Sequence, residues 1–225
     1  MDDELREEML RYYHQRADEY DGLYEGRVAT AIGRDVYVEE TAAVGRIARC
    51  FGKGAVLDVG CGTGFWLQFY ARNCSSFTFL DQSDRMLARS RERAESAGVA
   101  AQSVFVQAGF EDASLPEEAY DAALVGFVLS HVPAADEEGF LSKLSRVVKP
   151  QAQLLVIDSA WSPERQADRR KAGTLTRVLE DGREFRIYKR YFEAAELSEM
   201  VGCYGFGVRR LHFGKVFIAL LCDRA

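Results

Sequence analysis

Two carboxylates and three glycines stand in a pattern that can do chemistry. The segment "VLDVGCGTGF" (residues 56–65) places Asp58 just before a loop in which every second residue is glycine. These glycines are Gly60, Gly62 and Gly64. A loop without side chains lets ligand atoms approach backbone N–H groups at the start of a helix. Asp81 ends the next apolar run, where an acid can accept hydrogen bonds from both ribose hydroxyls. The pattern favours a ribose-bearing ligand.

The glycine spacing separates this loop from two phosphate-binding loops. It reads GxGxG, whereas a dinucleotide fingerprint reads GxGxxG and a P-loop ends in Gly-Lys-Ser/Thr. No lysine follows to hold a phosphate. A carboxylate beside the loop repels a pyrophosphate and attracts an ammonium or sulfonium group. A tight turn without a ligand, in which Asp81 only caps the turn, is the alternative interpretation.

Short, nearly continuous apolar runs alternate with helical segments along the chain. The runs cover residues 55–60, 77–81, 104–107, 121–128 and 153–158. Strands that are covered on both faces require such runs. Apolar residues recur at helical spacing in segments such as 84–98 and 137–150. This alternation predicts an α/β fold, a Rossmann-like doubly wound sheet of seven strands, mostly parallel. The last runs, 206–213 and 215–222, are separated only by Gly214, so they form an antiparallel hairpin at the sheet edge.

Composition limits the class of protein and its location. The chain has 225 residues, 48% of them hydrophobic and 28% charged, which is typical of one domain over residues 1–225. Its formal charge of −6 provides no global positive field for nucleic acid. The five cysteines form no CxxC pair, which favours reduced thiols in a cytosol. The first residues are acidic, and no apolar run approaches the ~20 residues that span a bilayer. We therefore expect a cytoplasmic protein.

In these motifs the chain resembles the class I S-adenosylmethionine-dependent methyltransferases, whose first motif typically reads like "VLDVGCGTG". The resemblance runs from about Tyr12 to Phe217 and is strongest over residues 55–160. It implies S-adenosyl-L-methionine as the cofactor and S-adenosyl-L-homocysteine as the product. The cofactor-binding residues that it implies are Tyr20, Asp58, Gly60, Cys61, Gly62, Gly64, Asp81, Gln82, Met86, Phe110, Glu111, Asp112 and Gly126.

The resemblance also assigns roles to some of these residues. Asp58 would support the amino end of the cofactor, directly or through water, and Asp81 would hold the ribose. Met86 would cover one face of the adenine, and Glu111 or Asp112 would accept a hydrogen bond from its amino group. Met86 as core filling is the alternative, because an apolar residue at helical spacing usually packs in the core.

The methyl acceptor is expected near the ends of the fourth and fifth strands. His131, in "GFVLSHVP", is the histidine near that mouth, and its ordinary pKa suits a general base for a hydroxyl acceptor. Alternatively, His131 bonds a loop carbonyl and orders the turn. The tyrosine-rich N-terminal segment (about 1–33) forms either a helical lid over the site or a helix fixed to the sheet edge by aromatic packing.

A second segment is expected to shape the acceptor pocket. Two alternating runs around Asp181-Gly182 predict a hairpin arm inserted at about 162–191. Basic residues outnumber acidic ones there, so Arg177, Arg186 or Lys189 meets an acidic substrate or a carrier phosphate, unless they form a solvated face. The candidate substrate-binding residues are Tyr12, Tyr13, His131, Trp161, Arg177 and Arg186.

The leading hypothesis is methylation of an oxygen, nitrogen or carbon atom of a small organic molecule. The chain has neither the Asn/Asp-Pro-Pro-aromatic loop common in enzymes that methylate nucleobase or glutamine amino groups nor a Pro-Cys nucleophile loop. No Asp/Asn cluster for Mg²⁺ can be assembled, so we expect no metal. An RNA-modifying methyltransferase and a non-catalytic cofactor-binding partner protein are the alternatives. We expect a small-molecule acceptor, no nucleic acid, no membrane, and a monomer or homodimer.

Overall fold

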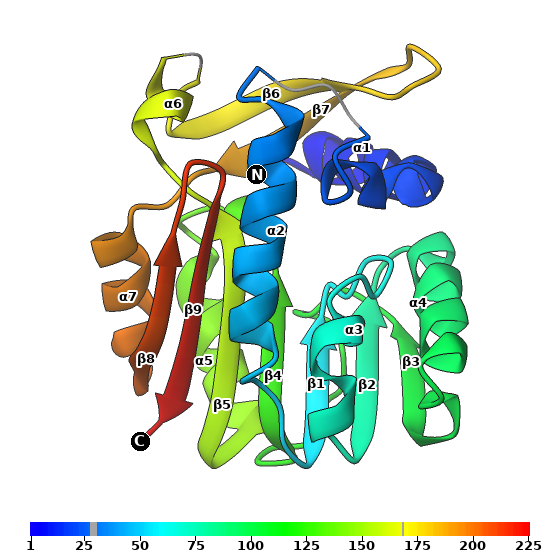
Figure 1. Ribbon diagram of the computed structural model, residues 1–225, viewed down its shortest axis with the longest axis vertical. Helices are drawn as coiled ribbons and strands as arrows, with labels where there is room; N and C mark the ends of the chain where they lie inside the picture. The colour runs from blue at the N-terminus through cyan, green and yellow to red at the C-terminus, as the bar shows by residue number, and fades with distance from the viewer. Residues whose placement is uncertain (28–30, 168) are drawn as a thin grey trace.

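Seven strands form one sheet in the order β3-β2-β1-β4-β5-β9-β8 (Figure 1). The computed structural model describes residues 1–27, 31–167 and 169–225. The strands are Ala55–Val59 (β1), Ser76–Asp81 (β2), Ser103–Gln107 (β3), Tyr120–Gly126 (β4), Val148–Ser159 (β5), Phe206–Phe213 (β8) and Phe217–Arg224 (β9). Strands β1 to β5 pair in parallel, whereas β9 runs antiparallel to both β5 and β8. The predicted fold class, with its antiparallel hairpin at the edge, is confirmed.

Helices cover both faces of the sheet (Figure 1). They are α2 (Arg34–Ala48), α3 (Leu67–Tyr70), α4 (Asp84–Ser96), α5 (Glu137–Val147) and α7 (Ala194–Gly202). Alternate strand residues serve the two faces: in β1, Val56 packs with α2, α3 and α4, and Leu57 packs with α5 and α7. Strand β1 pairs with both β2 and β4, so the strand order reverses there. In an open α/β sheet, the ligand crevice lies at this reversal, at the carboxyl ends of the strands.

Helix ends follow local signals in the sequence. The Ser83 side chain accepts a hydrogen bond from the Met86 N–H at 3.2 Å and so caps the start of α4 just after β2. Helix α7 begins with a capping box between Glu193 and Glu196. The sequence predicted no element at α7, because its nine residues offer few apolar positions to the sheet.

Two segments lie across the carboxyl ends of the parallel strands (Figure 1). The first, which we call the N-terminal cap, consists of α1 (Asp3–Gln15) and the 3-10 turns η1 (Arg16–Asp18) and η2 (Tyr20–Leu23). The second, the hairpin arm, consists of α6 (Pro163–Gln166), β6 (Ala172–Val178) and β7 (Glu184–Arg190). Strands β6 and β7 form a separate two-stranded sheet. Residues 28–30 and 168 of the expected lid and arm lie outside the described residues.

Candidate active site

The glycine loop after β1 leaves its backbone open to a cleft beneath the N-terminal cap. Gly60 has φ +60°, and a Cβ there would lie 2.4 Å from Val128 Cγ2, so both conformation and space require glycine. Gly62 has φ +55°, and a Cβ there would meet the ring of Tyr20 at 3.8 Å. The bare face of Gly62 therefore borders the cleft, where a ligand can lie against the backbone.

Asp81 is the last residue of β2 and lines the cleft next to the glycine loop. Its Oδ2 accepts a hydrogen bond from the Gly62 N–H at 2.9 Å, and its Oδ1 accepts one from the Ser83 N–H at 2.9 Å. Burial raises the pKa of this carboxyl, and the two N–H donors lower it in part. A carboxylate has about four lone-pair sites, so both oxygens retain capacity for further donors. Asp81 therefore caps the turn and also lines the cleft with unused acceptor sites.

Asp58 lies beneath the glycine loop and is 3% exposed. The Tyr70 hydroxyl donates to its Oδ2 at 2.8 Å. Burial raises the pKa of Asp58 to about 7, against the lowering effect of Tyr70. Asp58 lines a small cavity under the loop together with Gly60 and Cys61. A carboxyl in this setting is half-protonated near neutral pH, so a cationic ligand group nearby would hold it ionised.

We expect Asp58→Asn to remove part of the pH dependence of stability. The folded pKa of about 7 lies above the ordinary aspartate value of about 4, so the folded protein binds more protons than the unfolded chain between these pH values. The free energy of unfolding therefore falls as the pH rises from about 4 to about 7. Denaturant unfolding across this range measures the slope, which is smaller in Asp58→Asn. Equal slopes in the two proteins would contradict the shifted pKa.

The cleft collects most of the predicted cofactor residues. Those that line it are Tyr20, Gly60, Gly62, Asp81, Gln82, Met86, Phe110, Glu111 and Gly126. Asp58 and Cys61 line the smaller cavity under the loop. Gly64 instead packs on α4, where a Cβ would lie 3.1 Å from Ser90 Oγ. Of the two adjacent acids, Glu111 lines the cleft, whereas Asp112 is exposed outside the lining.

A tyrosine of the cap and a histidine of the loop after β4 form a hydrogen-bonded pair at one end of the cleft. The Tyr13 hydroxyl lies 2.7 Å from His131 Nε2, and His131 Nδ1 lies 2.7 Å from the Tyr188 carbonyl oxygen of β7. A carbonyl oxygen only accepts, so Nδ1 carries the proton and Nε2 accepts from Tyr13. Burial, followed by the charge of Lys189, lowers the pKa of His131 well below its usual value. The imidazole is therefore neutral near pH 7, with its basic nitrogen facing the cap.

A second cavity of about 520 Å³ lies beside the cleft, between the cap and the hairpin arm. Four residues line both spaces: Tyr13, Tyr20, Phe127 and His131. Phe127 has φ +58°, a left-handed conformation that costs roughly 1–3 kcal/mol in a non-glycine residue and recurs at functional sites. The two spaces therefore meet at a wall that contains the Tyr13–His131 pair.

This second cavity holds four of the six candidate substrate-binding residues, namely Tyr12, Tyr13, His131 and Arg177. Trp161 lies outside its lining and packs on the lining residue Tyr191, with ring centroids 5.9 Å apart. Arg186 is exposed and is bound by two acids of α1. Its Nε lies 2.8 Å from Glu8 Oε2, and its Nη2 lies 2.9 Å from Glu4 Oε1. The structure thus separates Arg186 from Arg177 and Lys189, the other two basic residues of its hairpin that were proposed to meet substrate.

Three further residues of the second cavity had no assignment from the sequence. They are Arg16, Arg165 and Tyr191. Arg16 lies over the rings of Tyr12 and Tyr20, at 5.5 and 5.1 Å from their centroids. Arg165 lies in the four-residue helix α6, where no periodic signal exists. The sequence shows that Tyr12, Arg16 and Tyr20 recur at helical spacing, but it does not show that these three side chains face the cavity.

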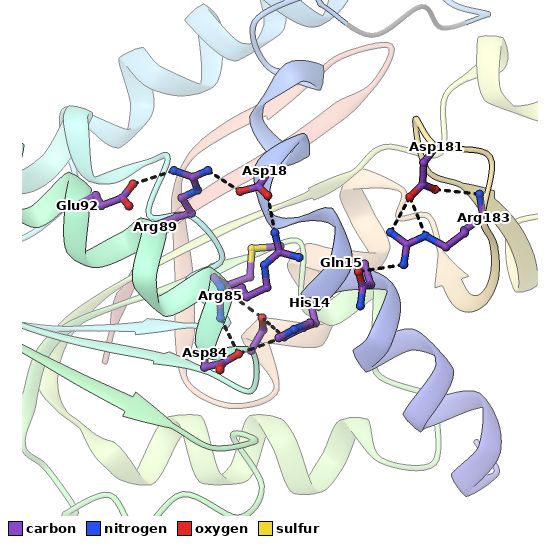
Figure 2. Close-up of polar contacts among 11 residues, drawn as sticks. His14, Gln15, Asp18, Asp84, Arg85, Arg89, Glu92, Asp181 and Arg183 are labelled. Carbon is purple, nitrogen blue, oxygen red and sulfur yellow. Dashed lines mark hydrogen bonds and ion pairs between the residues drawn. The ribbon is translucent and has the colours of Figure 1, made fainter.

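Charged side chains fasten the cap to α4 and to the hairpin arm (Figure 2). Asp18 forms ion pairs with Arg85 and with Arg89 of α4. Gln15 Oε1, at the end of α1, accepts a hydrogen bond at 3.0 Å from Nη1 of Arg183, which follows the turn of the hairpin arm. Exposed pairs of this kind each contribute about 0–1 kcal/mol. The cap is thus held above the cleft by several weak contacts rather than by one strong one.

Two features are absent from residues 1–27, 31–167 and 169–225. No group of three or more His, Cys, Asp or Glu side chains in these ranges is placed to hold a metal ion. No helix in the same ranges has both the length and the apolar character needed to cross a bilayer. Cys61 is a free thiol, and burial raises its pKa well above the ordinary value, so it does not supply a thiolate nucleophile.

Comparison with known proteins identifies similar sequences. A family model described as a methyltransferase domain matches residues 56–151. Phosphatidylethanolamine N-methyltransferase of Cereibacter sphaeroides is 31% identical over 105 residues, which are 47% of this chain and 50% of that protein. The ubiquinone/menaquinone biosynthesis C-methyltransferase UbiE of Proteus mirabilis (strain HI4320) is 29% identical over 161 residues, 69% of this chain and 61% of that protein. The chain spans about half the length of the curated relatives it matches.

A solved structure extends the likeness over nearly the whole chain. The complex of DhpI with SAM and HEP is 28% identical, with a TM-score of 0.77, and the match covers 99% of both chains. The match therefore includes the regions of the N-terminal cap and the hairpin arm, which the family model does not reach.

Proposed function

Since the chain belongs to the class I S-adenosylmethionine-dependent methyltransferases, we propose that it methylates a small organic molecule bound in the second cavity. The observation that carries this proposal is the wall of Tyr13, Tyr20, Phe127 and His131 that the cleft and the second cavity share. Two ligands bound in adjoining spaces can bring their reacting atoms together where the spaces meet, and holding reactants in this way is the origin of much of the acceleration of a displacement. The DhpI structure, with SAM and HEP in one complex, supports such a two-ligand arrangement.

The residues of the cleft fit the cofactor. Asp81 retains acceptor sites for ribose hydroxyls, and Glu111 lines the region proposed for the adenine. Met86 lines the cleft and is 1% exposed, so its burial fits packing in the core as well as contact with a flat ring. Gly126 presents bare backbone, since a Cβ there would come no closer than 3.8 Å to Trp66. S-adenosylmethionine supplies a methyl group on a sulfonium sulfur, and the sulfur keeps the bonding electron pair when the methyl leaves.

His131 acts as the general base for a hydroxyl acceptor. Its Nε2 is unprotonated at neutral pH and accepts a hydrogen bond from the Tyr13 hydroxyl at 2.7 Å, so an acceptor hydroxyl that takes the place of the Tyr13 hydroxyl donates to the same nitrogen. The proton passes to Nε2, and the acceptor oxygen keeps the electron pair that forms its new bond to carbon. The Tyr188 carbonyl holds the imidazole in the tautomer that this step needs.

The orientation of the arm favours a small acceptor over RNA. Arg177 pairs with Phe185 across the hairpin, and Ile187 pairs with Leu175, so Arg177 shares the inward face with these apolar residues. Lys189, on the same face, is 6% exposed. Docking on an RNA backbone needs exposed cations, whereas these two face a cavity.

We expect His131→Gln to lower kcat by about 100-fold, the usual size of a general-base contribution. The dissociation constant for S-adenosylhomocysteine stays within about twofold, because His131 acts on the acceptor. His14→Gln, which replaces a histidine of helix α1, is the matched control and leaves kcat unchanged. Turnover is measured as S-adenosylhomocysteine formation over a panel of small hydroxyl compounds.

The pH dependence of kcat shows whether His131 acts as a general base or only positions the acceptor. Because the pKa of His131 is lowered, kcat of the wild type is flat through neutral pH and falls only below the ordinary histidine range. His131→Gln removes that acid limb if the residue is the base. Full turnover by His131→Gln would refute the base, and cofactor binding without turnover on any acceptor would favour the non-catalytic alternative.

A further inference from the structure

The second cavity carries an excess of positive charge that the protein itself does not neutralise. Its cationic lining residues are Arg16, Arg165, Arg169, Arg177 and Lys189. Its acidic lining residues are Glu19, Glu164 and Glu180. The chain as a whole has a formal charge of −6, so this concentration of cations is local. A cavity lined with one sign of charge attracts ligands of the other.

Among the described residues, the contacts of the acids near the cavity do not involve its arginines. Glu164 faces Lys215, with Oε1 3.6 Å from Nζ, and Glu19 Oε2 accepts the Glu180 N–H at 3.0 Å. Buried Asp158 lies 3.6 Å from Lys189 and accepts the backbone N–H groups of Ser130, in the loop after β4, and of Ser159 at the end of β5. Within the described ranges, which omit residues 28–30 and 168, no carboxylate comes within ion-pair distance of the three arginines Arg16, Arg165 and Arg177.

Two buried donors of the lining lack a hydrogen-bond partner among the described residues. They are Arg165 Nε and the Tyr191 hydroxyl. Arg165 is 9% exposed, and its other polar contacts are the Val216 carbonyl at 3.1 Å and the Tyr37 hydroxyl at 3.5 Å. A buried charged donor without an acceptor is costly, and a bound anion is one of the physical reasons for which such a donor is retained. The guanidinium of Arg165 lies 4.8 Å from the centre of the Tyr191 ring, so these two lining residues are neighbours.

From these contacts we propose that the second cavity binds an oxyanion, the carboxylate or phosphate-type group of a small organic acid that is the methyl acceptor. Arg165 and Tyr191 donate to the oxyanion from one wall, and Arg177 donates from the arm. The acceptor's second, nucleophilic group then faces the Tyr13–His131 pair on the shared wall. This inference rests on the proposed function and assigns the acceptor class within it.

Anion binding can be measured without methyl transfer. The chain has three histidines, so the His131 imidazole resonance can be followed by NMR while the protein is saturated with S-adenosylhomocysteine. The probes are inorganic phosphate, acetate and the neutral analogue acetamide, at constant ionic strength. Phosphate or acetate is expected to shift the His131 resonance saturably, because an anion neutralises cations that act on this ring. Acetamide is expected to have no effect, and His212, on the outer strand β8, serves as the internal control.

Variants locate the binding to the cavity. In Arg177→Gln, a half-buried position, the half-saturating anion concentration rises about tenfold or more through loss of one charged hydrogen bond. Arg209→Gln removes the same charge from an exposed position on β8 and leaves that concentration unchanged. Arg177→Glu gives a second, stronger test. Preference for phosphate over acetate assigns a tetrahedral oxyanion, and the reverse assigns a carboxylate.

The result distinguishes this inference from the proposed function. No His131 shift with either anion, or an equal response in Arg177→Gln, overturns the anion site even if methyl transfer to neutral acceptors is observed. Saturable anion binding that depends on Arg177 supports the site even if turnover has not been detected. A thermal unfolding midpoint near that of the wild type confirms that each variant is folded.

Discussion

Replacing Asp81 with alanine is expected to weaken binding of S-adenosylmethionine by about 2 kcal/mol or more, roughly thirtyfold in the dissociation constant. On the proposed assignment, the ribose hydroxyls lose their charged acceptor. The N–H groups of Gly62 and Ser83 lose theirs as well, so the glycine loop is no longer tied to the end of β2. Both losses act at the cofactor cleft.

Calorimetric titration with S-adenosylmethionine, S-adenosylhomocysteine and NAD measures this effect. Asp84→Ala is the matched control: Asp84 lies three residues later, is exposed, and pairs with His14 at 3.1 Å. Wild type and Asp84→Ala bind the first two ligands equally well and do not bind NAD. An unchanged dissociation constant in Asp81→Ala would remove the ribose assignment, and preferential binding of NAD would contradict the cofactor.

The second large effect concerns stability. Glu40 of α2 is 8% exposed, and its carboxylate accepts the backbone N–H groups of three consecutive residues at the start of β9. The shortest contacts are 2.6 Å from Lys215 and 2.8 Å from Phe217. Burial would raise the pKa of Glu40, but His212 and these donors lower it overall. We expect Glu40→Ala to lower the free energy of unfolding by about 3 kcal/mol, because it leaves buried donors without an acceptor.

Denaturant unfolding of paired variants tests this expectation. Glu39→Ala removes the same group from the exposed neighbouring position and changes the free energy of unfolding by less than about 0.5 kcal/mol. Glu40→Gln retains one acceptor oxygen and gives an intermediate loss. Equal stability of Glu39→Ala and Glu40→Ala would show that the turn between β8 and β9 does not depend on this carboxylate.

The central sheet was predictable because its signal is local. A strand buried on both faces must be a continuous apolar run, and β1 to β4 were located to within one or two residues. β5 begins at Val148, earlier than the predicted 153, because its first residues are polar and its pairing with β4 has a register shift after Tyr120. Helix α7 was missed because Leu197 and Val201 alone are fully buried in it, which is too short a pattern to identify.

The grouping of the proposed cofactor residues around one cleft was predictable for the same reason, and the second cavity was not. Gly60, Gly62 and Asp81 are assigned by a motif whose residues lie within two adjacent elements. Tyr13 and His131 are 118 residues apart in the sequence, so their contact depends on how the N-terminal cap packs on the sheet. Arg177 and Arg186 have the same chemistry in the same arm, yet only the former faces inward. The side that a strand residue faces follows from register, which the sequence leaves undetermined.

The separate two-stranded sheet of the hairpin arm has a consequence for how this protein can diversify. Strands β6 and β7 pair with each other and belong to a different sheet from β1 to β5, β8 and β9. Inward residues of the arm can therefore be exchanged without changing a pairing register in the seven-stranded sheet. Acceptor choice and cofactor use become separable properties, so the arm offers a natural region for selecting new acceptors in directed evolution while the glycine loop is kept constant.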